Sequence, residues 1–81
     1  MEVTGTVLEM WSRAPISGVA VTADGHVTST DPSGRFSLDL PPGTYTIRFV
    51  HADYETATRS VVVTSPTDIG TVYLKPIFTP L

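Results

Sequence analysis

The sequence predicts an all-β domain, a seven-stranded antiparallel Greek-key β-sandwich, and two observations carry this prediction. Apolar and polar residues alternate with a period of two, as where Phe36, Leu38 and Leu40 alternate with Ser37 and Asp39. A strand that buries one face and exposes the other has this period. Clusters of turn-forming residues separate the alternating runs at short intervals, which is typical of sandwiches and barrels.

Each predicted strand is a run of alternating residues that ends at a turn cluster. Thr, Val, Tyr and Phe recur in these runs, and they suit a half-buried pleated surface. The first and last strands are predicted to lie at sheet edges. The seven strands span residues 2–9, 18–24, 26–30, 34–40, 44–51, 56–64 and 69–75. The predicted core comprises Val7, Val19, Val21, Phe36, Leu38, Tyr45, Ile47, Phe49, Val61 and Leu74.

Tight turns are predicted to fix the register of the central strands. The Asp-Gly pair at 24–25 favours a type I′ hairpin turn, which needs positive φ at both central residues. The Asp-Pro-Ser-Gly run at 31–34 has the preferences of a type I turn, and the Pro-Gly pair at 42–43 those of a type II turn. Gly70 is a candidate bulge within the last strand.

Composition excludes several classes of partner. The chain has 81 residues, enough for one small domain, and a net charge of −3 with only 5 Lys and Arg residues. Nucleic acids and anionic membranes are recognised by basic surfaces, so we expect no nucleic-acid binding. No apolar run is long enough to span a bilayer, so no membrane insertion is expected. Without cysteine, the chain has no disulfide and no thiolate metal site.

A series of short motifs resembles the carboxypeptidase regulatory-like domain, a family with a transthyretin-like, or prealbumin-like, sandwich of seven strands. The resemblance covers nearly the whole chain and implies a domain at 1–76, followed by an apolar tail or linker at 77–81. The motifs are Gly-Thr-Val at 5–7, Pro-Ile-Ser-Gly-Val-Ala-Val at 15–21, Thr-Asp-Pro-Ser-Gly-Arg-Phe at 30–36, Leu-Pro-Pro-Gly-Thr-Tyr at 40–45, Val-Val-Val at 61–63 and Gly-Thr-Val-Tyr-Leu at 70–74.

The resemblance implies a non-enzyme. Family members are accessory modules that support, space or bind other domains in secreted and cell-surface proteins, including outer-membrane receptors and metallocarboxypeptidases. The opening MEVTGTV lacks the basic and apolar regions of a signal peptide. Two locations are therefore consistent with the sequence. The chain is either a cytoplasmic protein or a module of a longer extracellular or cell-envelope protein, and the resemblance favours the second. Binding of a carbohydrate or another small ligand is the alternative function.

Residues that suit catalysis or metal binding are scattered along the chain, so no cofactor and no metal are expected. His26 and His51 have no further ligands at metal-binding spacing. The acids are not grouped as calcium requires, and Asp31 is explained by its turn. Lys75 is the only lysine, and no asparagine is present to form an isopeptide bond with it. The tyrosines lack the spacing of a related iron dioxygenase, and the chain lacks the Tyr-Arg-Gly-Ser ending of the related hydroxyisourate hydrolases.

Four apolar residues near the two predicted end strands form the candidate interface: Met10, Trp11, Ile77 and Phe78. Met10 and Trp11 occupy a loop that is usually polar in the family. Trp is enriched at the centres of protein interfaces, so these residues predict a surface for a neighbouring domain, another protein or a weak homodimer. The competing interpretation places Trp11 over the open end of the sandwich, where it closes the core.

Overall fold

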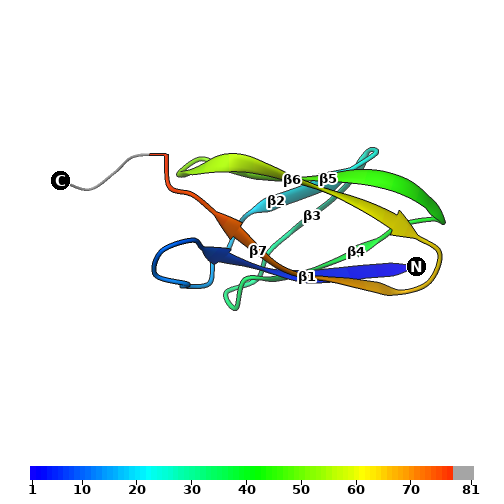
Figure 1. The fold of residues 1–81 in the computed structure, drawn as a ribbon, viewed down its shortest axis with the longest axis horizontal. Coiled ribbons are helices and arrows are strands. Elements are labelled where there is room, and N and C mark those ends of the chain that lie inside the picture. Colours follow the sequence, from blue (N-terminus) through cyan, green and yellow to red (C-terminus); the bar gives the residue numbers. More distant parts are fainter. Residues whose placement is uncertain (78–81) are drawn as a thin grey trace.

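Two sheets pack face to face in the computed structural model, which describes residues 1–77 (Figure 1). The three-stranded sheet has the order β4-β1-β7, with β1 at Glu2–Glu9, β4 at Arg35–Asp39 and β7 at Thr67–Leu74. The four-stranded sheet has the order β3-β2-β5-β6, with β2 at Ala20–Ala23, β3 at His26–Ser29, β5 at Gly43–His51 and β6 at Tyr54–Val63. The predicted all-β sandwich of seven strands is confirmed. No helix within these residues has the length and apolarity needed to cross a membrane.

One strand pair departs from the predicted antiparallel arrangement. β1 pairs with β4 in antiparallel fashion but with β7 in parallel. β1 therefore lies in the middle of its sheet, and the prediction that the first strand forms an edge is wrong, whereas β7 is an edge as predicted. The β1–β7 register shifts opposite Gly70, whose φ is 81°, so the predicted bulge is confirmed.

The core lies between the sheets and is built from the inward-facing residues of the alternating runs. Phe36 of β4 and Phe49 of β5 meet edge to face across the sandwich, with their ring centroids 5.5 Å apart. Eight of the ten predicted core residues are buried, and Tyr45 and Val61 are only half-buried at a cross-strand pair of β5 and β6. The buried apolar residues are Val3, Val7, Ile16, Val19, Val21, Ala23, Phe36, Leu38, Leu40, Ile47, Phe49, Val63, Val72 and Leu74.

Two of the three predicted turns have the expected geometry. Asp24 and Gly25 have φ values of 45° and 83°, as a type I′ turn requires. The Asp31 carbonyl accepts a hydrogen bond from the Gly34 amide at 2.8 Å. The Asp31 carboxylate also accepts the amides of Ser33 and Arg35, at 2.9 and 3.0 Å, so this acid stabilises its own turn.

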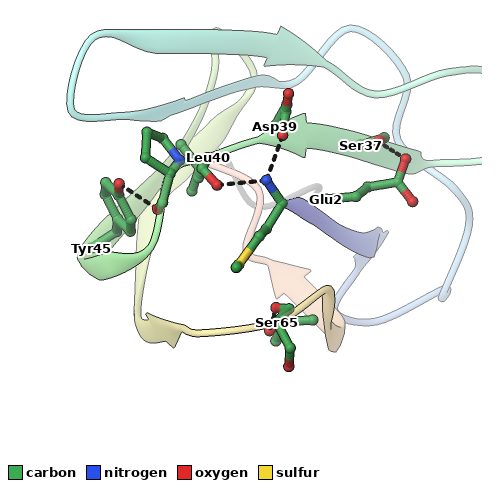
Figure 2. A network of polar contacts seen from close by, with 9 residues as sticks. Glu2, Ser37, Asp39, Leu40, Tyr45 and Ser65 are labelled. Atoms are coloured by element: carbon green, nitrogen blue, oxygen red, sulfur yellow. Dashed lines mark hydrogen bonds and ion pairs between the residues drawn. The ribbon is translucent and has the colours of Figure 1, made fainter.

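The type II turn predicted at 42–43 is wrong. Gly43 has a φ of 159°, close to extended backbone, and is already the first residue of β5, where it pairs with Val63. The chain crosses here from one sheet to the other, and Tyr45 secures the crossing by donating its hydroxyl to the Pro41 carbonyl at 2.7 Å (Figure 2). A tyrosine that bonds back to the backbone a few residues upstream is the tyrosine corner of β-sandwiches.

The N-terminal amino group lies at the same corner. It donates to the Asp39 carboxylate at 2.7 Å and to the Leu40 carbonyl at 2.8 Å (Figure 2). The hydrogen bond from this ammonium, together with its charge, lowers the pKa of Asp39 below its ordinary value. Because the carboxylate is exposed, the pair contributes little to stability.

Thr30 joins the loop before β2 to the end of β3. Its hydroxyl donates to the Ile16 carbonyl at 2.6 Å and accepts the Val19 amide at 3.0 Å. Its backbone adds two bonds, one to the Val19 carbonyl and one from the Gly18 amide. Thr30 is the only buried polar residue in the part of the chain that the structure describes, and its hydroxyl is fully paired.

Replacing Thr30 by Val is therefore expected to lower the free energy of unfolding by about 1–3 kcal/mol, because a buried amide and carbonyl lose their partner. Urea denaturation of the variant measures this loss. Thr46→Val is the matched control, since Thr46 is exposed on β5. Equal stabilities of the two variants would contradict the role assigned to the Thr30 hydroxyl.

Candidate interaction surface

The parallel pairing of β1 and β7 places the segments that follow both strands at one end of the sandwich (Figure 1). The Met10 amide donates to the Leu74 carbonyl at 3.0 Å, which fixes the start of one segment against the end of the other strand. Residues 10 and 77 are far apart in sequence, but the fold brings their segments to the same end. This proximity follows from the parallel pairing of β1 and β7.

The loop of residues 10–13 is closed tightly at its base. The Glu9 amide donates to the Ala14 carbonyl at 2.9 Å, and the Arg13 amide donates to the Glu9 carbonyl at 2.9 Å. Beyond the loop, Pro15 forms an antiparallel bridge with Leu8. Arg13 has a φ of 61°, the left-handed conformation that a turn of this tightness imposes on one of its residues. Because the base is fixed at Glu9 and Ala14, the loop projects from the end of β1.

This loop presents its apolar residues to solvent. Trp11 is 53% exposed and Met10 is 43% exposed. Neither residue belongs to the hydrophobic core cluster. The interpretation in which Trp11 closes the core is therefore wrong, and the remaining interpretation of Met10 and Trp11 as interface residues stays a prediction.

The segment after β7 is held against the turn between β5 and β6. The Glu55 amide donates to the Lys75 carbonyl at 2.8 Å, and the Ile77 amide donates to the Asp53 carbonyl at 3.1 Å. Between them, Pro76 forms an antiparallel bridge with Tyr54. Ile77 is nevertheless 60% exposed, so its side chain is available at this end of the molecule. Phe78, the fourth predicted interface residue, lies outside the described residues.

Tyr73 adds an aromatic ring that the sequence analysis did not assign to the interface. The Arg13 guanidinium lies 5.9 Å from the centroid of the Tyr73 ring, and Tyr73 is 41% exposed. A cation over an aromatic face at this distance is attracted by the ring. The contact brings the loop of residues 10–13 toward the outer face of β7. We call Met10, Trp11, Tyr73 and Ile77 together the end patch, by which we mean the exposed large side chains at this end of the sandwich.

Acidic groups flank the end patch. Partial desolvation raises the pKa of Tyr54 above its ordinary value, and the negative charges of Glu9 and Asp53 raise it further. The His51 and Tyr54 rings meet edge to face with centroids 5.2 Å apart, and the His51 Nδ1 atom accepts the Asp53 amide at 3.1 Å. Tyr54 therefore remains a neutral phenol over the physiological range, and it is the first residue of β6, directly after the turn of residues 52 and 53.

A separate polar groove lies at the opposite side of the sandwich from β6 and β7, between the edge strands β3 and β4. Its volume is about 430 Å³. On one wall, the Glu2 carboxylate accepts a hydrogen bond from the Ser37 hydroxyl at 2.8 Å. The Asp31 carboxylate already accepts a hydrogen bond from the Ser33 amide in its own turn. The only aromatic lining residue, Phe36, is 4% exposed. The groove is lined by Glu2, Thr4, Thr28, Ser29, Asp31, Arg35, Phe36 and Ser37.

The residues weighed for metal binding and catalysis stay apart in the fold. His26 pairs with Ala23 at one end of β2, whereas His51 follows Val50, which pairs with Ala20 at the other end. Within residues 1–77, no group of three His, Asp or Glu side chains is placed to hold a metal ion. The Lys75 ammonium lies 3.9 Å from the Glu55 carboxylate, and both side chains are more than half exposed, so this ion pair is a weak surface contact.

Excess EDTA is expected to leave the melting temperature unchanged, because the acids and histidines of the described residues do not converge. Differential scanning calorimetry with and without the chelator tests this expectation, and a magnesium–EDTA sample controls for ionic strength. A clear drop in melting temperature would instead indicate a structural metal, and Asp31 and His51 would be the first residues to replace.

The fold and the end patch define the chain as a small β-sandwich module with an exposed apolar end. The family model of the carboxypeptidase regulatory-like domain matches residues 2–75, and the chain belongs to that family. The family predicted from the sequence motifs is therefore confirmed.

Curated relatives are much longer than this chain. S-layer protein B of Metallosphaera sedula is 43% identical over 53 residues, which cover 64% of this chain and 13% of that protein. The TonB-dependent transporter Oar of Myxococcus xanthus is 34% identical over 67 residues, which cover 74% of this chain and 6% of the transporter. The chain thus spans only a small part of the length of these relatives.

Solved structures share the fold. A chain of a type II cohesin–X–dockerin complex from Acetivibrio cellulolyticus is 30% identical, with a TM-score of 0.76 over 88% of this chain and 52% of that one. A pilus backbone protein of group B streptococcus is 12% identical, with a TM-score of 0.67 over 93% of this chain and 40% of that one. The 5-hydroxyisourate hydrolase of Klebsiella pneumoniae is 17% identical, with a TM-score of 0.65 over 93% of this chain and 90% of the enzyme. At these low identities, the pilus and hydrolase likenesses show the fold alone.

Proposed function

We propose that this domain is a non-catalytic accessory module that supports, spaces or docks other domains within a longer cell-surface protein. The observation that carries the proposal is the exposed end patch, in which Trp11 and Ile77 stand in solvent at one end of a tightly built sandwich. The named relatives support the setting, since they are a surface-layer protein and a TonB-dependent transporter. The cell envelope is accordingly the proposed location.

The proposed occupant of the end patch is the domain that follows this one in the parent protein. Ile77 belongs to the patch, so a domain that follows the chain is tethered close to it in sequence. A short tether gives a high effective concentration, and a small apolar patch is then sufficient for docking. Trp is also enriched among the residues that anchor protein interfaces, and Trp11 is 53% exposed.

Trp11 offers a direct probe of this docking, because it is the only tryptophan in the chain. In the isolated module, its fluorescence is expected to be quenched readily by acrylamide. In the module joined to the following domain, with tryptophans of that domain replaced by Phe, the emission should shift to the blue and resist quenching. A concentration series of the isolated module tests the alternative occupant, a second copy of the chain.

Trp11→Ala is expected to weaken docking and leave the melting temperature of the isolated module nearly unchanged, because more than half of the side chain is exposed. Val27→Ala is the matched control, since Val27 is 68% exposed on β3, outside the patch. Sedimentation velocity and thermal melting separate the outcomes. Unfolding of the Trp11 variant would return this residue to the core, and unchanged association would show that the patch binds nothing.

The alternative function, binding of a carbohydrate or another small ligand, rests on the groove between β3 and β4. Sugar-binding sites present exposed aromatic rings, and Phe36 is buried in this groove, whereas Trp11 and Tyr54 are not among its lining residues. The groove offers hydroxyl and carboxylate groups without a stacking platform. The end patch therefore supports protein docking more strongly than the groove supports ligand binding.

A further inference from the structure

The first and last strands of the module are hydrogen-bonded neighbours that run in the same direction. Their ladder joins Val3 and Thr4 to residues 67 and 68, and after the bulge it joins residues 6–9 to residues 71–74. The bond from the Met10 amide to the Leu74 carbonyl closes the ladder at the Glu9–Leu74 pair. In a parallel ladder the bonds are evenly spaced along both strands, and here the bulge at Gly70 divides the ladder into a short part and a longer part.

The chain enters and leaves this ladder at opposite ends of the molecule. β1 starts at the N-terminal end of the sandwich, and β7 ends at the other end, beside the loop that follows β1 (Figure 1). Tension between neighbouring domains would pull β1 toward one end and β7 toward the other. The two strands would have to slide past each other along their length, which loads every bond of the ladder together.

We infer that this module bears tension along the parent chain, with the β1–β7 ladder as a shear-loaded clamp. The inference rests on the proposed function only in that a longer chain applies the tension. The tension would come from domains or anchors on both sides of the module that are pulled apart. A protein that links a cell to its surroundings experiences such tension.

Contacts on either side of the ladder reinforce the clamp. β1 is held at its second edge by β4 through five residue pairs, from Glu2–Asp39 to Thr6–Arg35, so it cannot slide without breaking a second ladder. Among the residues that the structure describes, no strand pairs with the outer edge of β7, but its Val72 and Leu74 side chains are 1% exposed and packed in the core. Sliding β7 by one residue would turn both side chains to solvent, because successive residues of a strand face opposite sides.

The segment of residues 75–77 would yield before the clamp. It is held to residues 53 and 55 by two backbone hydrogen bonds, and its side chains lie outside the core. Its release lengthens the chain by a few residues and leaves both sheets intact. Tension therefore reaches β7 only after this contact has opened.

Single-molecule force spectroscopy tests the clamp by comparing the force that ruptures the β1–β7 ladder in two pulling directions. In the first direction, the module is held through its N-terminus and its C-terminus, which shears β1 against β7. In the second, it is held through a cysteine at Ser12→Cys and through its C-terminus. Ser12 is exposed in the loop that follows β1, and the chain has no other cysteine to compete for the attachment. This second direction opens the ladder from the end at Leu74, one residue pair at a time.

The rupture force is expected to be several times higher in the first direction than in the second, because forced unfolding depends on the barrier along the pulled path. Equal forces in the two directions would overturn the inference. Thermal melting of the Ser12→Cys protein verifies that it is folded, and Ile47→Ala in the other sheet should lower both forces and keep their ratio. The measurement needs no neighbouring domain, so failure of docking through Trp11 leaves its outcome unaffected.

Discussion

Gly34→Ala is expected to lower the free energy of unfolding by roughly 2–6 kcal/mol, a large share of the stability of a domain of this size. Gly34 has a φ of 78°, a conformation that strains any residue with a side chain. A Cβ atom at this position would lie 2.5 Å from the Val7 carbonyl oxygen, 3.2 Å from the Pro15 Cβ and 3.3 Å from the Ile16 amide nitrogen. The obstacles include backbone atoms of β1 and of the loop before β2.

Those backbone atoms cannot move without breaking hydrogen bonds. The Val7 carbonyl accepts the Ile16 amide at 3.1 Å, and the Val7 amide donates to the Gly34 carbonyl at 2.7 Å. Gly34 thus occupies the point where the turn of residues 31–34 meets β1 at close range. Urea denaturation and circular dichroism of the alanine variant measure the loss of stability or of folding.

Gly18→Ala separates strain from steric conflict. Gly18 also has a positive φ, 72°, but no atom lies within 4 Å of the position its Cβ would take. The free energy of unfolding of its alanine variant should fall only by the cost of the left-handed conformation, about 1–2 kcal/mol. If both variants lose the same stability, the close approach of Gly34 to Val7 is not the cause of the larger expected effect.

Ile47→Ala is expected to cost about 2–5 kcal/mol, the usual range for removing a large buried aliphatic side chain. Ile47 is 0% exposed on β5, a central strand of its sheet, and belongs to the core shared with the other sheet. The cavity left by the truncation lies between two sheets, both of which are fixed by hydrogen bonds. Little collapse is therefore available to recover the lost contacts.

Val62→Ala is the control, because it also removes aliphatic groups from the β5–β6 strand pair but does so on the exposed face. Val62 lies on β6 and is 64% exposed, so its truncation should change stability by no more than about 0.5 kcal/mol. Equilibrium urea denaturation of both variants gives the comparison. A loss of similar size in both would mean that the register of β5 differs from the one described.

The strands were predictable because their signals are local. The period of two identifies the inward-facing residues, and Asp24 with Gly25 specifies its turn without help from the rest of the chain. The parallel partner of β1 was not predictable in this way, because an alternating strand has the same pattern beside a parallel or an antiparallel neighbour. The Pro-Gly pair at 42–43 misled for a related reason: Gly43 pairs with Val63, and this pairing overrides the local preference for a type II turn.

The end patch was predictable only in part. The apolar character of Met10 and Trp11 was evident, but their exposure depends on the closure of the loop between Glu9 and Ala14, which the sequence does not display. Tyr73 has the pattern of any outward-facing residue in a strand. Its place beside the loop depends on the approach of Arg13, a contact that only the folded arrangement creates.

The position of β1 also affects when the domain can fold. β2 and β3, and likewise β5 and β6, are neighbours in sequence joined by short turns, so these hairpins can form early. β1 has no such neighbour: it pairs with β4 and β7, which lie much later in the chain. Closing such long loops is slow, since the entropy is lost before the contacts form. During synthesis, the three-stranded sheet is therefore complete only after residues 67–74 have left the ribosome, and until then the sheet that covers the apolar face of the four-stranded sheet lacks β7.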